Sequence, residues 1–278
     1  MVDFSNDQAA GLRALLRRIP VQRVAFAALA PACGASRVAS ALACVLAEQG
    51  YRVALIDEFQ GPGSASWRMG LSSRLDLLQV VNHDTTLARL RLASAQGVSV
   101  FPAARLAAQG AGLSRLQMAE LDQALARIER DHEFLLIDAA MPDQRLSVLA
   151  RRAERWVFAL NDTAPALTGA YALIKRQAAH YPSAALELLY GACTRTRAEA
   201  AHANLTALCA QQLRTQPGWL GWLPRDANAG QPGNAPEALE LARMTADRWL
   251  DDTQDARGTH PELAVRRAVA SRLPENLQ

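Results

Sequence analysis

The sequence predicts an α/β protein: a doubly wound, mostly parallel sheet with helices on both faces, preceded by a short N-terminal helix. Short apolar segments typical of buried strands alternate with amphipathic helices along most of the 278 residues, which is the pattern of a parallel sheet covered on both faces. The first strand passes through a turn of small residues directly into a helix, as in a nucleotide-binding βαβ unit. No clear linker interrupts the alternation, so we expect one large α/β domain.

The N-terminal segment is expected to form a helix of its own. Ser5 followed by Gln8 is typical of a capping box, apolar residues at helical spacing form one face, and Pro20 ends the helix. The α/β body follows, and then a polar linker and a basic amphipathic segment. The predicted units are residues 1–20, 21–250 and 251–278.

The βαβ unit begins the body. A strand at residues 24–29 leads into a turn at 30–36, and a helix at 37–49 follows. The second strand, residues 53–56, ends in Asp57. Such a unit places a phosphate-binding turn at the amino end of its helix. The turn at residues 30–36 is therefore the candidate site for a bound nucleotide.

The remaining elements complete the alternation. Further strands are expected at residues 98–101, 134–137, 156–160, 186–190 and 219–223. Helices are expected at residues 75–81, 114–130, 167–179, 198–213 and 236–250, and loops at 61–66 and 226–234. Ligands of such folds bind at the carboxyl ends of the strands, where Gly34, Asp57 and Asp138 fall. Trp219 and Trp222 should point to opposite sides of the last strand, one into the core.

Composition favours a cytoplasmic protein that does not bind nucleic acid. The net charge is +3 and the arginines are scattered, as on a solvated surface. The cysteines and histidines show no metal-ligand spacing. Cys44 and Cys209 are expected in the core, and the histidines at the surface. No uninterrupted apolar stretch is long enough to span a membrane, and no signal peptide precedes the polar N-terminus.

Four segments of the body resemble the MinD/ParA class of deviant P-loop ATPases: VALIDEFQG (53–61), FLLIDAA (134–140), TAPALTGAYALIK (163–175) and LGWLPRD (220–226). The last resembles the adenine-side turn Gly-x-x-Pro-x-Asp of that class. Ahead of the body, DQAAGLR (7–13) matches D-Q-A-x-x-L-R, which is typical of the FlhG (FleN) branch of MinD-like regulators of flagellar number.

This resemblance implies partners for the chain. In the FlhG branch the N-terminal segment activates an FlhF-like GTPase of the signal-recognition type, and Gln8 would order the attacking water there. The alternative is that Gln8 only caps the helix. The implied contact residues are Asp7, Gln8, Ala9, Leu12 and Arg13. Flagellar switch proteins, transcription regulators and a second copy of the chain are further partners that the resemblance suggests.

The resemblance also suggests a location at the inner face of the cell membrane, because MinD-like proteins carry a membrane-targeting helix near the C-terminus. The corresponding segment, residues 263–273, is basic and amphipathic. Its apolar face consists of alanine, valine and one leucine, which predicts only weak interfacial binding.

The phosphate-binding loop departs from the family pattern K-G-G-x-G-K-T-T. Ala30 and Ala35 stand where the two lysines belong, and Pro31 and Ala32 replace two glycines. Pro31 removes a backbone N–H, and an alanine at position 32 disfavours a positive φ. The degenerate nucleotide site is expected to comprise Gly34, Ala35, Ser36, Arg37, Pro224 and Asp226.

Two hypotheses about nucleotide follow. Without both lysines, and with Phe59 in place of the switch aspartate, hydrolysis is expected to be lost. Phe59 would then fill the vacated space as a core or lid residue, and Asp57 and Asp138 would cap turns. Alternatively, ATP or ADP binds, and Ser36 and Asp138 hold the Mg²⁺ ion. The catalytic candidates are then Asp57 and Asp138. In this hypothesis the chain is an ATP-switched dimer that acts at the membrane or in DNA or cargo partitioning.

Overall fold

The computed structural model describes residues 21–181, 185–225 and 232–255. The predicted N-terminal helix and the basic C-terminal segment lie outside the described residues. So do several of the predicted site residues, namely Asp7, Gln8, Ala9, Leu12, Arg13 and Asp226.

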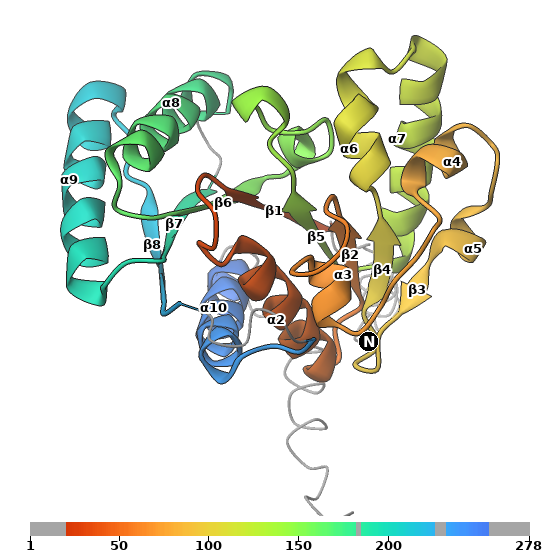
Figure 1. Ribbon diagram of the computed structural model, residues 1–278, viewed down its shortest axis with the longest axis horizontal. Coiled ribbons are helices and arrows are strands. Elements are labelled where there is room, and N and C mark those ends of the chain that lie inside the picture. The colour runs from red at the N-terminus through yellow and green to blue at the C-terminus, as the bar shows by residue number, and fades with distance from the viewer. Residues whose placement is uncertain (1–20, 182–184, 226–231, 256–278) are drawn as a thin grey trace, which may run out of the picture.

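An eight-stranded sheet forms the centre of the protein, in the order β3-β4-β2-β5-β1-β6-β7-β8 (Figure 1). Its strands are β1 (Gln22–Ala28), β2 (Val53–Asp57), β3 (Leu92–Ala93), β4 (Ser99–Pro102), β5 (Phe134–Ala139), β6 (Arg155–Leu160), β7 (Ala185–Gly191) and β8 (Gly218–Leu223). Each neighbouring pair is parallel except β3 with β4. The predicted mostly parallel sheet is therefore confirmed.

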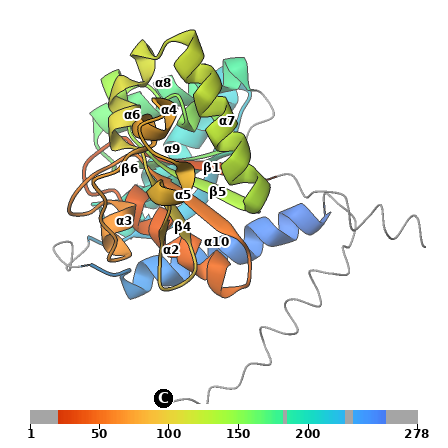
Figure 2. The same ribbon diagram turned by 90° about the vertical axis from the view of Figure 1, so that its right-hand side faces the viewer.

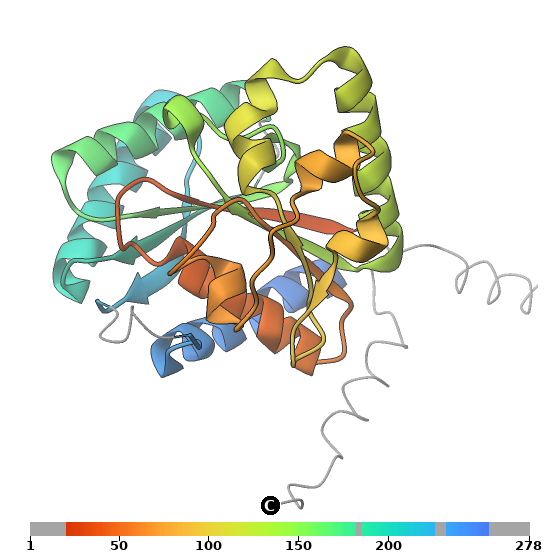
Figure 3. The ribbon, with the colours of Figure 1, turned by 45° about the vertical axis from the view of Figure 1, so that its right-hand side comes forward.

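Helices cover both faces of the sheet (Figure 2, Figure 3). One face carries α2 (Ala35–Glu48) and α10 (Pro236–Asp255), and the other carries α7 (Arg115–Asp131), α8 (Ala164–His180) and α9 (Arg195–Leu213). The shorter helices are α3 (Ala65–Arg68), α4 (Leu77–Val81), α5 (Leu87–Leu90) and α6 (Ala104–Gln109), with 3₁₀ turns η1 (Gly110–Gly112), η2 (Pro142–Gln144) and η3 (Ala150–Arg152).

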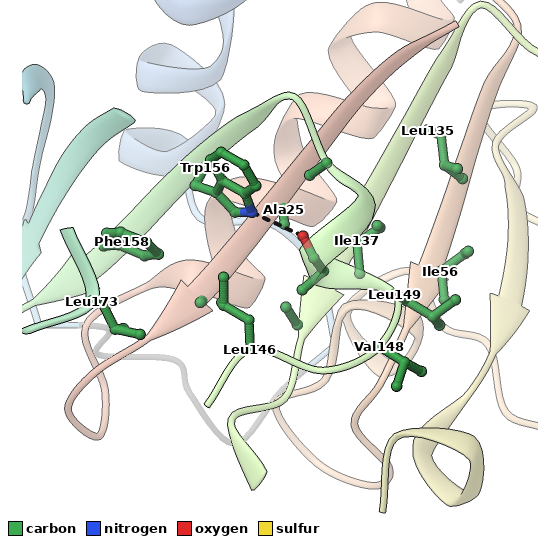
Figure 4. Packing of buried hydrophobic residues seen from close by; sticks show 14 of the residues in the cluster. Ala25, Ile56, Leu135, Ile137, Leu146, Val148, Leu149, Trp156, Phe158 and Leu173 are labelled. Carbon is green, nitrogen blue, oxygen red and sulfur yellow. Dashed lines mark hydrogen bonds between the residues drawn. The ribbon is translucent and has the colours of Figure 1, made fainter. Parts of the chain in front are cut away.

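Strand β5 shows how the two helical layers share the sheet. Its residues are all buried, and successive side chains enter opposite clusters: Leu135 and Ile137 pack toward α7 and α8, while Leu136 packs toward α2. Figure 4 shows the first cluster, in which the indole nitrogen of Trp156 donates a 2.8 Å hydrogen bond to the carbonyl oxygen of Ala150. Burial on both faces explains the continuous apolar runs of the sequence.

Several short elements do not follow from the sequence pattern. Helices α3, α5 and α6 and strand β3 have between two and six residues, too few to develop a recognisable period. Helix α3 begins inside the predicted loop 61–66, where the Ser64 hydroxyl accepts a hydrogen bond from the Trp67 amide. The loop prediction is therefore wrong at its end.

Strand β8 contains an irregularity that overturns the prediction for its tryptophans. The register with β7 runs from Leu188 opposite Trp219 to Leu189 opposite Gly221, so one extra residue is inserted. An inserted residue reverses the alternation of the side chains that follow. Trp219 and Trp222 consequently pack against the same cluster, both partly buried.

Two further expectations concern single side chains. Cys44 and Cys209 are buried, as expected. His132, expected at the surface, is buried, and its Nδ1 lies 2.6 Å from the carbonyl oxygen of Ile128. In the described part of the chain, no helix has the length and apolar character needed to cross a membrane.

Candidate functional site

The candidate site lies where β1, β2 and β5 end. Asp57 of β2 and Asp138 of β5 occupy matching positions in the parallel pair, and both are buried. The turn between β1 and α2 covers the neighbouring carboxyl end, at the centre of the sheet. The structure therefore brings together Asp57, Asp138 and the degenerate loop, as expected for a ligand site of this fold class.

The turn lies very close to the ends of β7 and β8 at two glycine residues. Gly34 is the N-cap of α2 with φ of 93°, and a Cβ atom there would lie 2.8 Å from Leu223 Cδ1. On the other side, a Cβ atom at Gly191 would lie 2.6 Å from the carbonyl oxygen of Cys33. The turn therefore packs directly against the ends of β7 and β8, and neither glycine leaves room for a Cβ atom.

Ala32 occupies the conformation that its replacement of glycine was expected to disfavour, with φ of 58°. A left-handed conformation costs a residue with a Cβ atom about 1–2 kcal/mol. Ala32→Gly should therefore raise the free energy of unfolding by about 0.5–1 kcal/mol, after the added flexibility of the unfolded chain is subtracted. Urea denaturation measures the change. Ala30→Gly, in a residue without positive φ, should have the opposite sign, and equal signs would contradict this account.

The first turn of α2 contains one charged residue, Arg37, and its position does not suit a phosphate. Arg37 is only 4% exposed, and its NH1 group donates a 2.8 Å hydrogen bond to the carbonyl oxygen of Pro224. The predicted residues Arg37 and Pro224 therefore meet, through a bond that joins α2 to the end of β8. Ala35, at a lysine position, is buried.

Asp57 serves as an acceptor within its own turn. One carboxylate oxygen accepts the Phe59 amide at 3.0 Å, and the other accepts the Ser66 amide at 2.7 Å and the Ser66 hydroxyl. Burial raises the pKa of Asp57, and these hydrogen bonds oppose the rise. Phe59 itself is 37% exposed, so the expectation that it is a core residue is wrong, while its place as a lid residue stays a prediction.

Asp138 differs from Asp57 in lacking such bonds. Neither of its carboxylate oxygens has a hydrogen-bond partner of good geometry among the described residues. Burial, followed by the charge of Asp57, raises the pKa of Asp138 well above its ordinary value, while the nearby Ser36 hydroxyl and Ala65 amide partly offset the rise. A buried carboxyl group without partners favours its neutral form. The structure thus places the Ser36 hydroxyl near Asp138, and their role as a metal pair stays a prediction.

Glu58 is the site residue that the sequence analysis missed. It is 3% exposed; its carboxylate accepts the Ser147 hydroxyl at 2.6 Å and the Ala140 amide at 2.8 Å. Burial, opposed by these bonds, raises the pKa of Glu58 to about 7. Glu58 therefore ties the end of β2 to the segment after β5. The only signal in the sequence was a second carboxylate directly after Asp57.

The residues present do not fit a Mg²⁺–nucleoside triphosphate. Asp138 and Ser36 retain oxygen donors of the kind that Mg²⁺ takes. The turn, however, offers no lysine, Pro31 supplies no N–H, and Arg37 donates to a carbonyl group. No cluster of three or more His, Cys, Asp or Glu residues in the described ranges is arranged to hold a metal ion.

Known proteins resemble the chain in fold and, over part of its length, in sequence. MinD from the MinC:MinD complex of Aquifex aeolicus matches with a TM-score of 0.61 and 13% identity over 82% of this chain and 96% of MinD. A plasmid partition protein of Borrelia burgdorferi B31, solved with AMPPNP, matches with a TM-score of 0.62 and 13% identity over 84% and 99%. The chain has the MinD/ParA fold.

Two further comparisons refine this assignment. MinD of Pyrococcus horikoshii OT3, complexed with Mg-ADP, shares the MinD/ParA fold with a TM-score of 0.60 and 16% identity over 82% of this chain and 97% of that protein. The antiactivator FleN of Pseudomonas aeruginosa PAO1 is 32% identical over 158 residues, which span 56% of each protein. The sequence resemblance to FleN is therefore confirmed over about half of its length. No family model matches the chain.

Proposed function

We propose that the protein is a FlhG/FleN-type regulator of flagellar number or placement that acts by binding proteins and has lost ATP hydrolysis. The observation that carries this proposal is a FleN-like chain in which the buried Asp138 faces a turn without lysine. The proposal extends a match over about half of FleN to the whole protein. Residues 1–20, 21–250 and 251–278 are its three proposed functional parts.

Loss of hydrolysis follows from the charge requirements of phosphoryl transfer. Catalysis consists largely of positioning the phosphates and stabilising the charge that develops on them. Removing one preorganised electrostatic group commonly costs about 10²–10³ in rate, and this turn lacks both lysines. Arg37 does not replace them, because its NH1 group is bonded to the Pro224 carbonyl oxygen.

The proposed partner is an FlhF-like GTPase, bound through Asp7, Gln8, Ala9, Leu12 and Arg13. These residues lie outside the described part, so support comes from the pattern D-Q-A-x-x-L-R and from the resemblance to FleN. Flagellar switch proteins or transcription regulators are proposed partners of the α/β body. Weak membrane association through residues 263–273 belongs to the same proposal.

Gln8→Ala tests the assigned role. We expect the variant to lose stimulation of GTP hydrolysis by an FlhF-like GTPase, because the proposed group that orders the attacking water is removed. The measurement is single-turnover GTP hydrolysis with and without the regulator. Gln123→Ala, in an exposed glutamine of α7, is the matched control and should stimulate normally. Full stimulation by Gln8→Ala would refute the assignment.

The alternative function is an ATP-switched dimer. The observation that favours it is the fold shared with a partition protein that was solved with AMPPNP. Calorimetric titration with ATP and ADP in Mg²⁺, combined with light scattering, separates the two. Our proposal expects neither micromolar binding nor a change in molar mass. Mg²⁺-dependent binding followed by dimerisation, both abolished in Asp138→Asn, would establish the alternative.

A further inference from the structure

A groove of about 440 Å³ lies between α8 and the segment that contains η2 and η3. Arg145 and Arg151 line it from that segment, and Arg176 lines it from α8. We call it the arginine groove and define it by these three residues. It lies outside the carboxylate site described above.

The arginines of the groove have no carboxylate partner among the side chains that the structure describes. All three arginines are exposed, and none forms an ion pair with another described side chain. Arg151 donates to the carbonyl oxygen of Ser147 at 3.3 Å, and Arg176 to that of Gln144 at 3.3 Å. These bonds orient two guanidinium groups without neutralising them, so the groove attracts anions.

The floor of the groove is apolar. Leu146 and Leu173 line it while belonging to the buried cluster shown in Figure 4. Tyr181 lies at the rim, 46% exposed, with its ring centroid 5.4 Å from that of Trp156. An aromatic ring fixed at the rim of an apolar floor is typical of surfaces that receive a side chain of a partner.

A buried amide supplies a second, independent indication of a ligand. Gln177 lines the groove and is only 8% exposed, yet its Oε1 atom has no hydrogen-bond partner in the described ranges. An unsatisfied buried acceptor is costly. Because Gln177 lines the groove and the terminal torsion of glutamine is soft, an N–H group of a ligand bound there is a suitable donor for this oxygen.

We propose that the arginine groove binds an acidic peptide segment of a protein partner, one that carries carboxylates beside an apolar residue. The carboxylates pair with the guanidinium groups, the apolar residue meets Leu146 and Leu173, and a peptide N–H satisfies Gln177. A phosphate group or a nucleic-acid backbone supplies charge but neither the apolar side chain nor the donor. The body is then a second docking element, independent of residues 7–13.

The test uses the full chain and a short fluorescein-labelled peptide of glutamate and leucine residues, followed by fluorescence anisotropy. Replacing all three arginines (Arg145→Gln, Arg151→Gln and Arg176→Gln) should weaken binding by about tenfold or more, since each partly exposed ion pair contributes up to about 1 kcal/mol. The matched control replaces three exposed arginines elsewhere (Arg115→Gln, Arg130→Gln and Arg243→Gln) and should change binding less than about twofold.

Gln177→Leu separates binding from folding. The change removes an unsatisfied oxygen, so the melting temperature should not fall, while peptide binding should weaken about fivefold through the lost hydrogen bond. A peptide with glutamine in place of glutamate should not bind. Equal binding by the two triple variants, or binding of a glutamine peptide, overturns the proposal. Equally tight, arginine-dependent binding of phosphatidylglycerol vesicles or duplex DNA also overturns it, in favour of a general anion surface.

Discussion

The free energy of unfolding is expected to fall by about 3 kcal/mol on account of Glu58 alone as the pH rises from 4.5 to about 7. In this window the unfolded chain has released the proton of Glu58, while the folded chain retains it. Raising the pH therefore favours the unfolded state. The full stability contributed by the neutral carboxyl group is present below pH 4.5 and is lost once the pH passes about 7.

Glu58→Gln isolates this effect, because glutamine cannot titrate and retains the size of the side chain. Urea denaturation followed by circular dichroism, in EDTA between pH 5 and 8, should give a shallower pH dependence for the variant than for the parent protein. Asp138, whose pKa is also raised by burial, adds a fall of the same sign. Glu240→Gln, at an exposed residue of α10, is the control. Parallel curves for parent and Glu58→Gln would show that Glu58 is not buried as a neutral acid.

Glu187→Ala is expected to lower the free energy of unfolding by about 3 kcal/mol, the lower end of the cost of breaking a buried ion pair. Glu187 is buried on β7 and pairs with Arg155 and, at 2.6 Å, with Arg248; it also accepts the Trp249 indole N–H at 3.0 Å. Removing the carboxylate leaves two guanidinium groups without their partner. Both are partly exposed, which moderates the loss.

Two comparisons make this measurement specific. Glu187→Gln retains an oxygen for the Trp249 indole and should lose less stability than the alanine variant. Glu237→Ala, in an exposed glutamate of α10, should change the free energy of unfolding by less than about 0.5 kcal/mol. Thermal and urea unfolding provide the values. An alanine variant as stable as the parent would show that the network contributes nothing.

The fold was predictable because its strands are buried on both faces. A strand such as β5 is apolar at nearly every position, and this pattern can be recognised without knowing which residues pack against the strand. Trp219 and Trp222 were misplaced because an inserted residue in β8 depends on its pairing with β7, and the sequence of one strand does not show where its partner lies.

The candidate site was predictable only in part, for a related reason. Asp57 and Asp138 follow apolar strands, so their position at the carboxyl edge could be inferred. The importance of Glu58 depends on Ser147, which lies 89 positions further along the chain. The role of Asp57 as an acceptor depends on Ser66, which lies in the short helix α3. The pattern of residues that are close in the sequence indicates neither contact.

Among the residues that the structure describes, strand β8 has a neighbour on one side only, and such a strand offers its free backbone groups to strands of other molecules. Arg248 counters this hazard, since its NH1 group donates a 3.1 Å hydrogen bond to the carbonyl oxygen of Trp219. The same guanidinium is held by Glu187 on β7. One arginine therefore joins α10 to β7 through an ion pair and occupies a backbone acceptor of β8 through a hydrogen bond.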